Sequence, residues 1–194
     1  MIDSKQIRKE LLGRRNDLTP SELKEKSARI VQQLLELEPI KNSKTIFVYV
    51  SFRSEVATEE LIDKLIDLGK TVTVPITRVQ EKRLDAIAIT SRQNELEPGY
   101  CDIPEPKAEL YPSQAVSPQE IDTILLPGSV FDERGGRFGY GGGYYDRFVS
   151  SVPQATRIGL AFDLQIIEKA PLAPHDEILD LVVTESRVIR GRRQ

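Results

Sequence analysis

The 194-residue sequence has few of the residues on which several common kinds of site depend. Its one cysteine, Cys101, excludes an internal disulfide and is compatible with a reducing cytosol. Its one histidine, His175, excludes a zinc site built from several histidines. Tryptophan is absent, so aromatic stacking on a ligand must come from six tyrosines and six phenylalanines.

Long apolar runs and excess positive charge are also missing. No apolar run approaches the roughly 20 residues that a membrane-spanning helix needs, and the first residues do not resemble a signal peptide. The net charge of −3 argues against a dedicated nucleic-acid-binding protein. We therefore expect a cytoplasmic protein without a nucleic-acid or membrane partner. With 39% hydrophobic residues, the length predicts one domain with a packed core.

The order of periodic segments predicts the fold class. Residues 3–15 form a basic helical pattern, and a second helix begins at Thr19-Pro20 and ends before Pro39. Residues 45–51 are a β-branched and aromatic run, and residues 71–75 are a second one. A helical pattern at 57–69 separates them, so this β-α-β unit should pair its strands in parallel.

Four further strands are expected, at residues 84–90, 123–127, 157–162 and 181–184. The proline-rich residues 95–112 are expected to form a loop. Strands alternating with helices predict a three-layer α/β/α sandwich with a mostly parallel, Rossmann-like sheet. We expect a single α/β domain over residues 1–194, with an N-terminal helical segment, about 1–38, packed on it. Ligands of such folds bind beyond the carboxyl ends of the strands.

A glycine-rich segment at 133–143 contains six of the twelve glycines and lies between a predicted strand and a predicted helix. Bare backbone amides at a helix start favour an anion, and Arg137 adds a guanidinium suited to phosphate. The segment matches neither the dinucleotide fingerprint nor a Walker A loop. The alternative to a phosphate site is a flexible, hairpin-like loop without a ligand.

Several charged residues near these segments allow two interpretations each. Asp146 could hold a phosphate-bound magnesium ion or only complement a helix dipole. Asp176 could bind the metal or be a solvated loop acid. Glu55 lies between a strand end and a helix start, so its carboxylate could either contact a substrate or simply favour the start of the helix. The cations of the first helix could clamp a polyphosphate or form a solvated face.

Two long motifs resemble the signature of the 5-formyltetrahydrofolate cyclo-ligase family. They are residues 124–132, ILLPGSVFD, and residues 136–147, GRFGYGGGYYDR. Residues 159–163 with Gln165, the pair His175-Asp176, and residues 182–185 resemble the C-terminal block of the family. The resemblance also includes residues 54–58 and the first helix, and thus covers nearly the whole chain.

The resemblance implies an ATP- and Mg²⁺-dependent ligase of one-carbon metabolism. Such an enzyme converts 5-formyltetrahydrofolate to 5,10-methenyltetrahydrofolate, with release of ADP and phosphate, through a phosphorylated formyl group. It also implies which residues form the site. Those expected to bind ATP are Lys5, Arg8, Lys9, Arg137, Phe138, Gly139, Tyr140, Gly141, Gly142, Gly143, Tyr144 and Tyr145. Those expected to bind the reduced folate are Val50, Glu55, Tyr140, Gly141, Gly142, Gly143 and Tyr144. Arg137 and Tyr144 are expected to be catalytic, and Asp146 and Asp176 to bind the metal.

The register of the first helix allows two alignments with the family. The first helix of the family typically has a lysine four residues before its arginine; if Arg8 is that arginine, Ser4 occupies the lysine position. The alternative register pairs Lys5 with Lys9, but only the Arg8 register also places Arg15 and Leu18 correctly.

Without the resemblance, the alternative function is a phosphate-binding α/β enzyme of the sugar-phosphate isomerase or CoA-transferase type. We expect a monomer.

Overall fold

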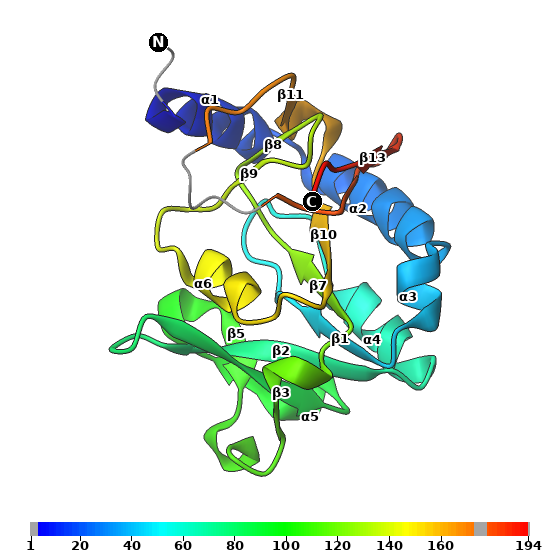
Figure 1. Cartoon of the computed structure of the whole chain (residues 1–194), viewed down its shortest axis with the longest axis vertical. Helices are drawn as coiled ribbons and strands as arrows, with labels where there is room; N and C mark the ends of the chain where they lie inside the picture. Colours follow the sequence, from blue (N-terminus) through cyan, green and yellow to red (C-terminus); the bar gives the residue numbers. More distant parts are fainter. Residues whose placement is uncertain (1–3, 173–177, 194) are drawn as a thin grey trace.

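A computed structural model of the chain describes residues 4–172 and 178–193 (Figure 1). The α-helices there are α1 (Ser4–Asn16), α2 (Pro20–Leu35), α3 (Glu38–Asn42), α4 (Glu59–Asp67), α5 (Arg92–Glu95) and α6 (Tyr144–Ser150). The strands are β1 (Thr45–Val48), β2 (Thr71–Arg78), β3 (Arg83–Ile89), β4 (Leu96–Pro98), β5 (Pro104–Pro106), β6 (Ala115–Val116), β7 (Thr123–Leu126), β8 (Val130–Asp132), β9 (Arg137–Phe138), β10 (Thr156–Leu160), β11 (Ile166–Ile167), β12 (Leu181–Val183) and β13 (Val188–Arg190). Short 3-10 turns are η1 (Tyr100–Asp102), η2 (Ala108–Leu110), η3 (Pro118–Glu120) and η4 (Asp163–Gln165).

The main sheet has eight strands in the order β13-β12-β10-β7-β1-β2-β3-β6. Its five central strands, β12 to β2, all run in parallel, as the β-α-β pattern predicted. Both edges are antiparallel, because β3 follows β2 as a hairpin and β13 returns beside β12. The carboxyl ends of the central strands therefore point to one edge of the sheet, where ligands of open α/β sheets bind.

Alternate residues of the central strands pack into different layers, which confirms the predicted three-layer sandwich. In β7, Leu125 packs in one hydrophobic cluster while Ile124 and Leu126 pack in the other. In β12, Leu181 and Val183 likewise lie on the face opposite to Val182. Helices α2, α3 and α4 cover the first face, and α6 packs on the second. This coverage agrees with the positions of these helices in Figure 1.

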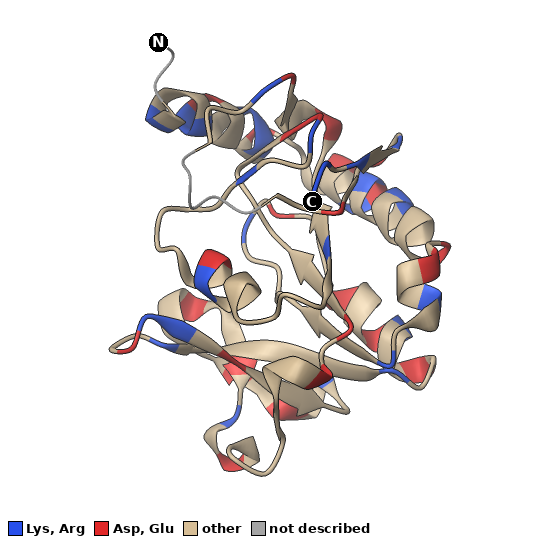
Figure 2. Cartoon of the chain, viewed as in Figure 1, with Lys and Arg blue, Asp and Glu red and all other residues tan. Residues whose placement is uncertain are grey.

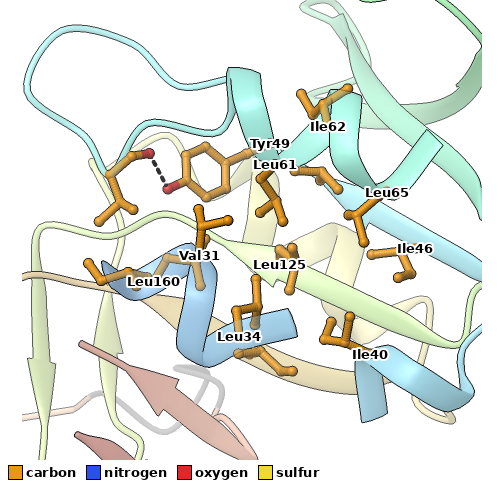
Figure 3. Packing of buried hydrophobic residues seen from close by; sticks show 14 of the residues in the cluster. Val31, Leu34, Ile40, Ile46, Tyr49, Leu61, Ile62, Leu65, Leu125 and Leu160 are labelled. Carbon is orange, nitrogen blue, oxygen red and sulfur yellow. Dashed lines mark hydrogen bonds between the residues drawn. The ribbon is translucent and has the colours of Figure 1, made fainter. Parts of the chain in front are cut away.

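The larger cluster fixes the N-terminal helices to the sheet. Figure 3 shows side chains of α2, α3 and α4 interleaved with those of three strands: Val31, Leu34, Ile40, Leu61, Ile62, Leu65, Ile46, Leu125 and Leu160. The ring of Tyr49 is buried among them, and its hydroxyl donates a hydrogen bond of 2.8 Å to the carbonyl oxygen of Val56. This bond satisfies a buried polar group and ties down the chain after β1.

Two predicted segments have more structure than expected. Residues 95–112, expected to be a loop, contain the β4–β5 hairpin, whose strands are brought together over the intervening turn η1. The glycine-rich residues 133–143 are not one loop: the antiparallel pair β8–β9 uses the first glycines as its turn. Only residues 139–143 remain as the loop that leads into α6.

Charges of both signs are spread over the elements, while α1 is mainly basic (Figure 2). Among the described residues, no helix combines the length and the apolar character needed to cross a bilayer.

Candidate active site

The segment after β1 presents the first carboxylate of the site at the carboxyl edge of the sheet. Thr58 folds this segment back on itself: its hydroxyl donates to the Tyr49 carbonyl at 2.8 Å and accepts from the Ser51 N–H at 2.9 Å. The Phe52 N–H then donates to the carboxylate of Glu55 at 2.9 Å. Glu55 is therefore held by its own loop before any ligand binds.

The β8–β9 hairpin is organised around the fully buried carboxylate of Asp132. It accepts hydrogen bonds from the N–H groups of Arg134, Gly136 and Ala170 at 2.7–2.9 Å and pairs with the Arg134 guanidinium. Burial favours the neutral acid, but these donors hold the pKa of Asp132 below its ordinary value. A Cβ at position 136 would lie 2.8 Å from this carboxylate, so the hairpin requires glycine there.

The hairpin places Arg137 under the glycine loop. This guanidinium is almost fully buried and donates to the carbonyl oxygen of Pro127 at 2.9 Å and to the carboxylate of Asp146 at 2.5 Å. Its Nε atom is buried and has no hydrogen-bond partner among the described residues. A buried donor without a partner is costly, so this site is suited to a ligand that accepts a hydrogen bond.

A polar pocket of about 520 Å³ lies on one side of the glycine loop. It is lined by Ser4, Arg8, Phe138, Gly139, Gly141, Gly142, Gly143, Asp146, Arg147, Ser150 and Pro171. The guanidinium of Arg8 lies 5.7 Å from the centre of the Phe138 ring, and its buried Nε has no partner in the described part of the chain. Two guanidinium groups, backbone amides of the loop and one carboxylate thus face this pocket.

An aromatic pocket of about 490 Å³ lies on the other side of the loop. It is lined by Leu12, Arg15, Asn16, Phe52, Arg53, Glu55, Pro75, Thr77, Leu84, Tyr100, Cys101, Ile103, Glu105, Tyr140, Gly142, Tyr144 and Tyr145. Apolar and aromatic side chains form most of its wall, and the Glu55 and Glu105 carboxylates supply acceptors. Such a lining suits a flat, largely apolar ligand with a few polar groups.

The two pockets share the glycine loop as a wall. A small cavity of about 100 Å³ lies between them and is lined by Arg137, Gly139, Tyr140, Gly142, Gly143, Tyr144, Tyr145 and Asp146. Gly142 lines all three spaces. A group in the polar pocket and a group in the aromatic pocket would therefore meet beside Arg137 and Tyr144.

The carboxylate and the phenols of the aromatic pocket influence each other's protonation. Burial raises the pKa of Glu55, while the Tyr140 hydroxyl, the Phe52 N–H and the Arg15 guanidinium oppose that rise. Burial and the nearby Glu55 charge raise the pKa of both Tyr140 and Tyr145. The phenols therefore stay protonated and can donate hydrogen bonds across the physiological pH range.

The structure brings most of the expected site residues together but not all of them. Arg8, residues 137–146 and Glu55 surround the two pockets, whereas Lys5 and Lys9 are exposed on α1 and do not line the polar pocket. Val50 is only 4% exposed and belongs to the core cluster, so any ligand contact would fall to its main chain. Asp176 and His175 lie outside the described residues.

Several residues of the aromatic pocket were not among the expected ones. Tyr100 and Cys101 come from the β4–β5 hairpin, and Glu105 comes from β5. β5 packs against β2, and no local sequence pattern predicts that contact. Arg15 did have a detectable signal. With Leu11 and Leu12 it falls on the apolar face of α1, and a cation on an apolar face is unusual.

The donor set around Asp146 fits a magnesium ion only in part. No cluster of three or more Asp, Glu, Cys or His side chains suited to a metal occurs among residues 4–172 and 178–193. Mg²⁺ usually takes one or two carboxylates and completes its shell with phosphate oxygens and water. Asp146, at the edge of the polar pocket, fits that role together with a bound polyphosphate.

Comparison with known proteins identifies relatives over most of the chain. Residues 1–185 match the model of the 5-formyltetrahydrofolate cyclo-ligase family. The 5-formyltetrahydrofolate cyclo-ligase of Escherichia coli is 32% identical over 177 residues, which cover 90% of this chain and 96% of that protein. The mouse 5-formyltetrahydrofolate cyclo-ligase is 30% identical, over 92% of each chain. The NMR structure of 5,10-methenyltetrahydrofolate synthetase from Aquifex aeolicus superposes with a TM-score of 0.85 at 29% identity, over 98% of this chain and 94% of that one.

Proposed function

The chain belongs to the 5-formyltetrahydrofolate cyclo-ligase family, and from this membership we propose that it cyclises 5-formyltetrahydrofolate to 5,10-methenyltetrahydrofolate at the expense of ATP. The observation that supports this most directly is the glycine loop shared by a cationic polar pocket and an aromatic pocket. An enzyme that transfers a phosphoryl group from a nucleotide to a folate needs two such pockets side by side, with the reacting groups meeting between them.

ATP is proposed to occupy the polar pocket. The Arg8 guanidinium, whose Nε has no partner among the described residues, lines this pocket, and the buried Arg137 lines the adjoining small cavity. Both supply charge-assisted donors for phosphate oxygens. The backbone of Gly139, Gly141, Gly142 and Gly143 can approach the phosphates closely because no side chain intervenes. Ser4 and Arg8 line the pocket together, which supports the helix register with Arg8 as the ATP-binding arginine.

The reduced folate is proposed to occupy the aromatic pocket. Its flat ring system would pack against the rings of Tyr140, Tyr144 and Tyr145, while the Glu55 carboxylate accepts from its N–H groups. Burial in this pocket also excludes water from the reacting formyl group. Val50 would contribute through its main chain alone.

The chemistry requires activation of the formyl oxygen, since the oxygen of an amide is a poor leaving group. In the proposed sequence the γ-phosphoryl group moves from ATP to this oxygen, with ADP leaving. N10 of the folate then attacks the formyl carbon, the C–O bond breaks, phosphate leaves with the oxygen, and N10 loses its proton to solvent. Arg137 and Tyr144 line the small central cavity and would stabilise the transferred phosphoryl group by positioned donors.

A magnesium ion would be held by Asp146 and Asp176 together with the phosphate oxygens of ATP. When bound, it supplies positive charge that offsets the charge of the polyphosphate. Asp146 lines the polar pocket, and its ion pair with the buried Arg137 holds the carboxylate in place. Since the site draws on α1, on the loops after β1 and β9 and on α6, we propose that residues 1–194 act as a single α/β domain. We further propose a cytoplasmic monomer that acts on these two small molecules and on neither nucleic acid nor membrane.

One assay tests the proposed function. The purified protein is mixed with 5-formyltetrahydrofolate, ATP and Mg²⁺, and the absorbance of the methenyl product is followed. We expect product only when all components are present. Turnover without ATP would favour an isomerase or transferase, and turnover at full rate with excess chelator would contradict the role of the metal.

A further inference from the structure

Arg15, near the end of α1, is a buried cation at the wall of the aromatic pocket. Only 5% of the residue is exposed, although the preceding Arg14 in the same helix has a side chain that is 61% exposed. Arg15 has no carboxylate within 4 Å in the described part of the chain; Arg14 pairs with Glu10 at 2.6 Å. A buried charge without a paired opposite charge costs stability, and a well-packed apolar side chain of similar size would avoid that cost.

The hydrogen bonds of Arg15 join three separate segments of the site. Its Nε donates to the hydroxyl of Ser54 at 3.0 Å, next to Glu55. Its Nη1 donates to the carbonyl oxygen of Gly128 at 3.2 Å, after β7, and to the hydroxyl of Tyr140 at 2.8 Å. A planar guanidinium with several fixed donors can hold three acceptors at once, which a lysine ammonium on a flexible stem cannot do in the same geometry.

Tyr140 is the partner through which Arg15 reaches the glycine loop. Although burial of its hydroxyl raises the pKa of Tyr140, 44% of the residue is exposed, so packing alone does not fix its ring. Its hydroxyl accepts from Arg15, lies 3.3 Å from the Gly128 carbonyl oxygen, and interacts with the Glu55 carboxylate. The Arg15 guanidinium also lies 5.6 Å from the centre of the Tyr140 ring. Arg15 is thus the charged donor among the groups that hold this hydroxyl, and its bond of 2.8 Å is shorter than the 3.3 Å contact with Gly128.

We propose that Arg15 is a positioning residue for the reduced folate: it fixes the Tyr140 hydroxyl, and with it the loop wall of the aromatic pocket. This inference rests on the proposed function, because the folate is the ligand whose pocket Arg15 lines. Arg15 does not line the polar pocket, so its effect falls on the folate and on turnover more than on ATP.

Steady-state kinetics of Arg15→Ala, Tyr140→Phe and the double variant test this proposal, with Arg14→Ala as the matched control. We expect each single variant to lower kcat/KM for 5-formyltetrahydrofolate at least about tenfold, as the loss of a hydrogen bond involving a charged group does, with a much smaller change in KM for ATP. The double variant should lose little more than either single one, because both changes break the same contact. Added guanidine, below denaturing concentrations, should partly restore Arg15→Ala, and Arg14→Ala should match the wild type.

The outcomes separate the two proposals. A wild-type protein that forms no methenyl product refutes the proposed function, and this inference with it. An active wild type with an equally active Arg15→Ala variant overturns only the role of Arg15. Additive losses in the double variant would also overturn it, since Arg15 would then act independently of Tyr140. If Arg15→Ala fails to fold, Tyr140→Phe decides: a folded Tyr140→Phe enzyme with unchanged kcat/KM for the folate overturns the proposal.

Discussion

Arg8 differs from the other cations of α1 in what its side chain contacts. Its guanidinium packs on Phe138, and its buried Nε has no partner within residues 4–172 and 178–193, while Lys5 and Lys9 project from exposed positions of the same helix. We expect Arg8→Ala to raise KM for ATP at least about tenfold, because a charge-assisted contact to phosphate contributes on the order of 1.5–3 kcal/mol. Steady-state kinetics at saturating folate would measure this change.

The neighbouring cations provide the comparison. Lys5→Ala should raise KM for ATP less than Arg8→Ala, and Arg14→Ala, which removes only an exposed pair with Glu10, should change little. If Lys9→Ala were the most damaging substitution and Arg8→Ala were silent, the helix register would be wrong by one residue. If all four were silent, the basic face of α1 would be solvated and would not bind ATP.

Glu55 should make folate binding sensitive to acid. Burial raises its pKa, so its carboxylate gains a proton at a pH above the ordinary range for glutamate. We expect kcat/KM for the folate to fall as the pH drops through this raised pKa. In Glu55→Gln, kcat/KM should be low throughout and this acid limb should be lost; a pH–rate profile would show both.

The same shift has the opposite sign for stability. A carboxyl group with a raised folded-state pKa stabilises the fold below its unfolded pKa, and this contribution is lost as the pH rises through the folded value. Glu55→Gln should therefore be no less stable than the wild type in urea unfolding at neutral pH, although it is less active. A neutral-pH loss of stability, or an unchanged folate KM, would contradict this assignment. Glu133→Gln, an exposed acid paired with Arg187, is the control.

At the scale of an element, the loop before α6 requires glycine for its backbone conformation rather than because a side chain would lack space. A Cβ on Gly141 would meet nothing within 4 Å, but its φ of +99° is one that side chains rarely adopt. Gly141→Ala should cost about 1–2 kcal/mol of stability or shift the loop, and should raise KM for ATP. Thermal unfolding and ATP titration would separate these two effects.

Gly13 is the matched control because it also has open space around its Cβ, but it lies inside α1 with no positive φ. Gly13→Ala should leave ATP binding unchanged and stabilise the helix by about 0.5–1 kcal/mol. If Gly141→Ala bound ATP as the wild type does, the glycines of this loop would be conformational only.

At the scale of the whole molecule, ATP should stabilise the fold by binding between separate elements. The polar pocket is formed by α1, β9, the glycine loop and α6, so unfolding removes the site entirely. A ligand at 100 times its Kd raises the free energy of unfolding by about 2.7 kcal/mol, which for a chain of this size is roughly 5–10 °C in Tm. Thermal unfolding with ATP and Mg²⁺, in the absence of folate, would measure the shift.

The metal should account for part of that stabilisation. We expect a smaller shift when ATP is added with excess chelator, and Asp146→Asn should lose the metal-dependent part while it keeps the rest. Equal shifts with and without the metal would show that Asp146 serves only the Arg137 ion pair and the start of α6.

The sequence by itself determined the elements whose patterns are local. The continuous apolar runs of β1, β7 and β12 indicate strands buried on both faces, and the apolar stripe of α2 with its Thr19 cap indicates a helix packed on them. The glycine segment with Arg137 and Asp146 is contiguous, so a linear motif was enough to predict a phosphate site and to show a family resemblance. These features need only neighbours along the chain, with spacings set by the helix and the strand.

The tertiary structure decided which distant residues meet. Arg15, Glu55 and Tyr140 are far apart in the chain and converge only because parallel strands bring their carboxyl ends to one edge, where α1 is packed. Residues 133–136 became the turn of a hairpin because the buried Asp132 gathers their N–H groups, and Val50 was drawn into the core. A local sequence pattern cannot show that one loop separates two pockets. That arrangement depends on contacts between segments far apart in the sequence, and helix and strand periodicity do not specify such contacts.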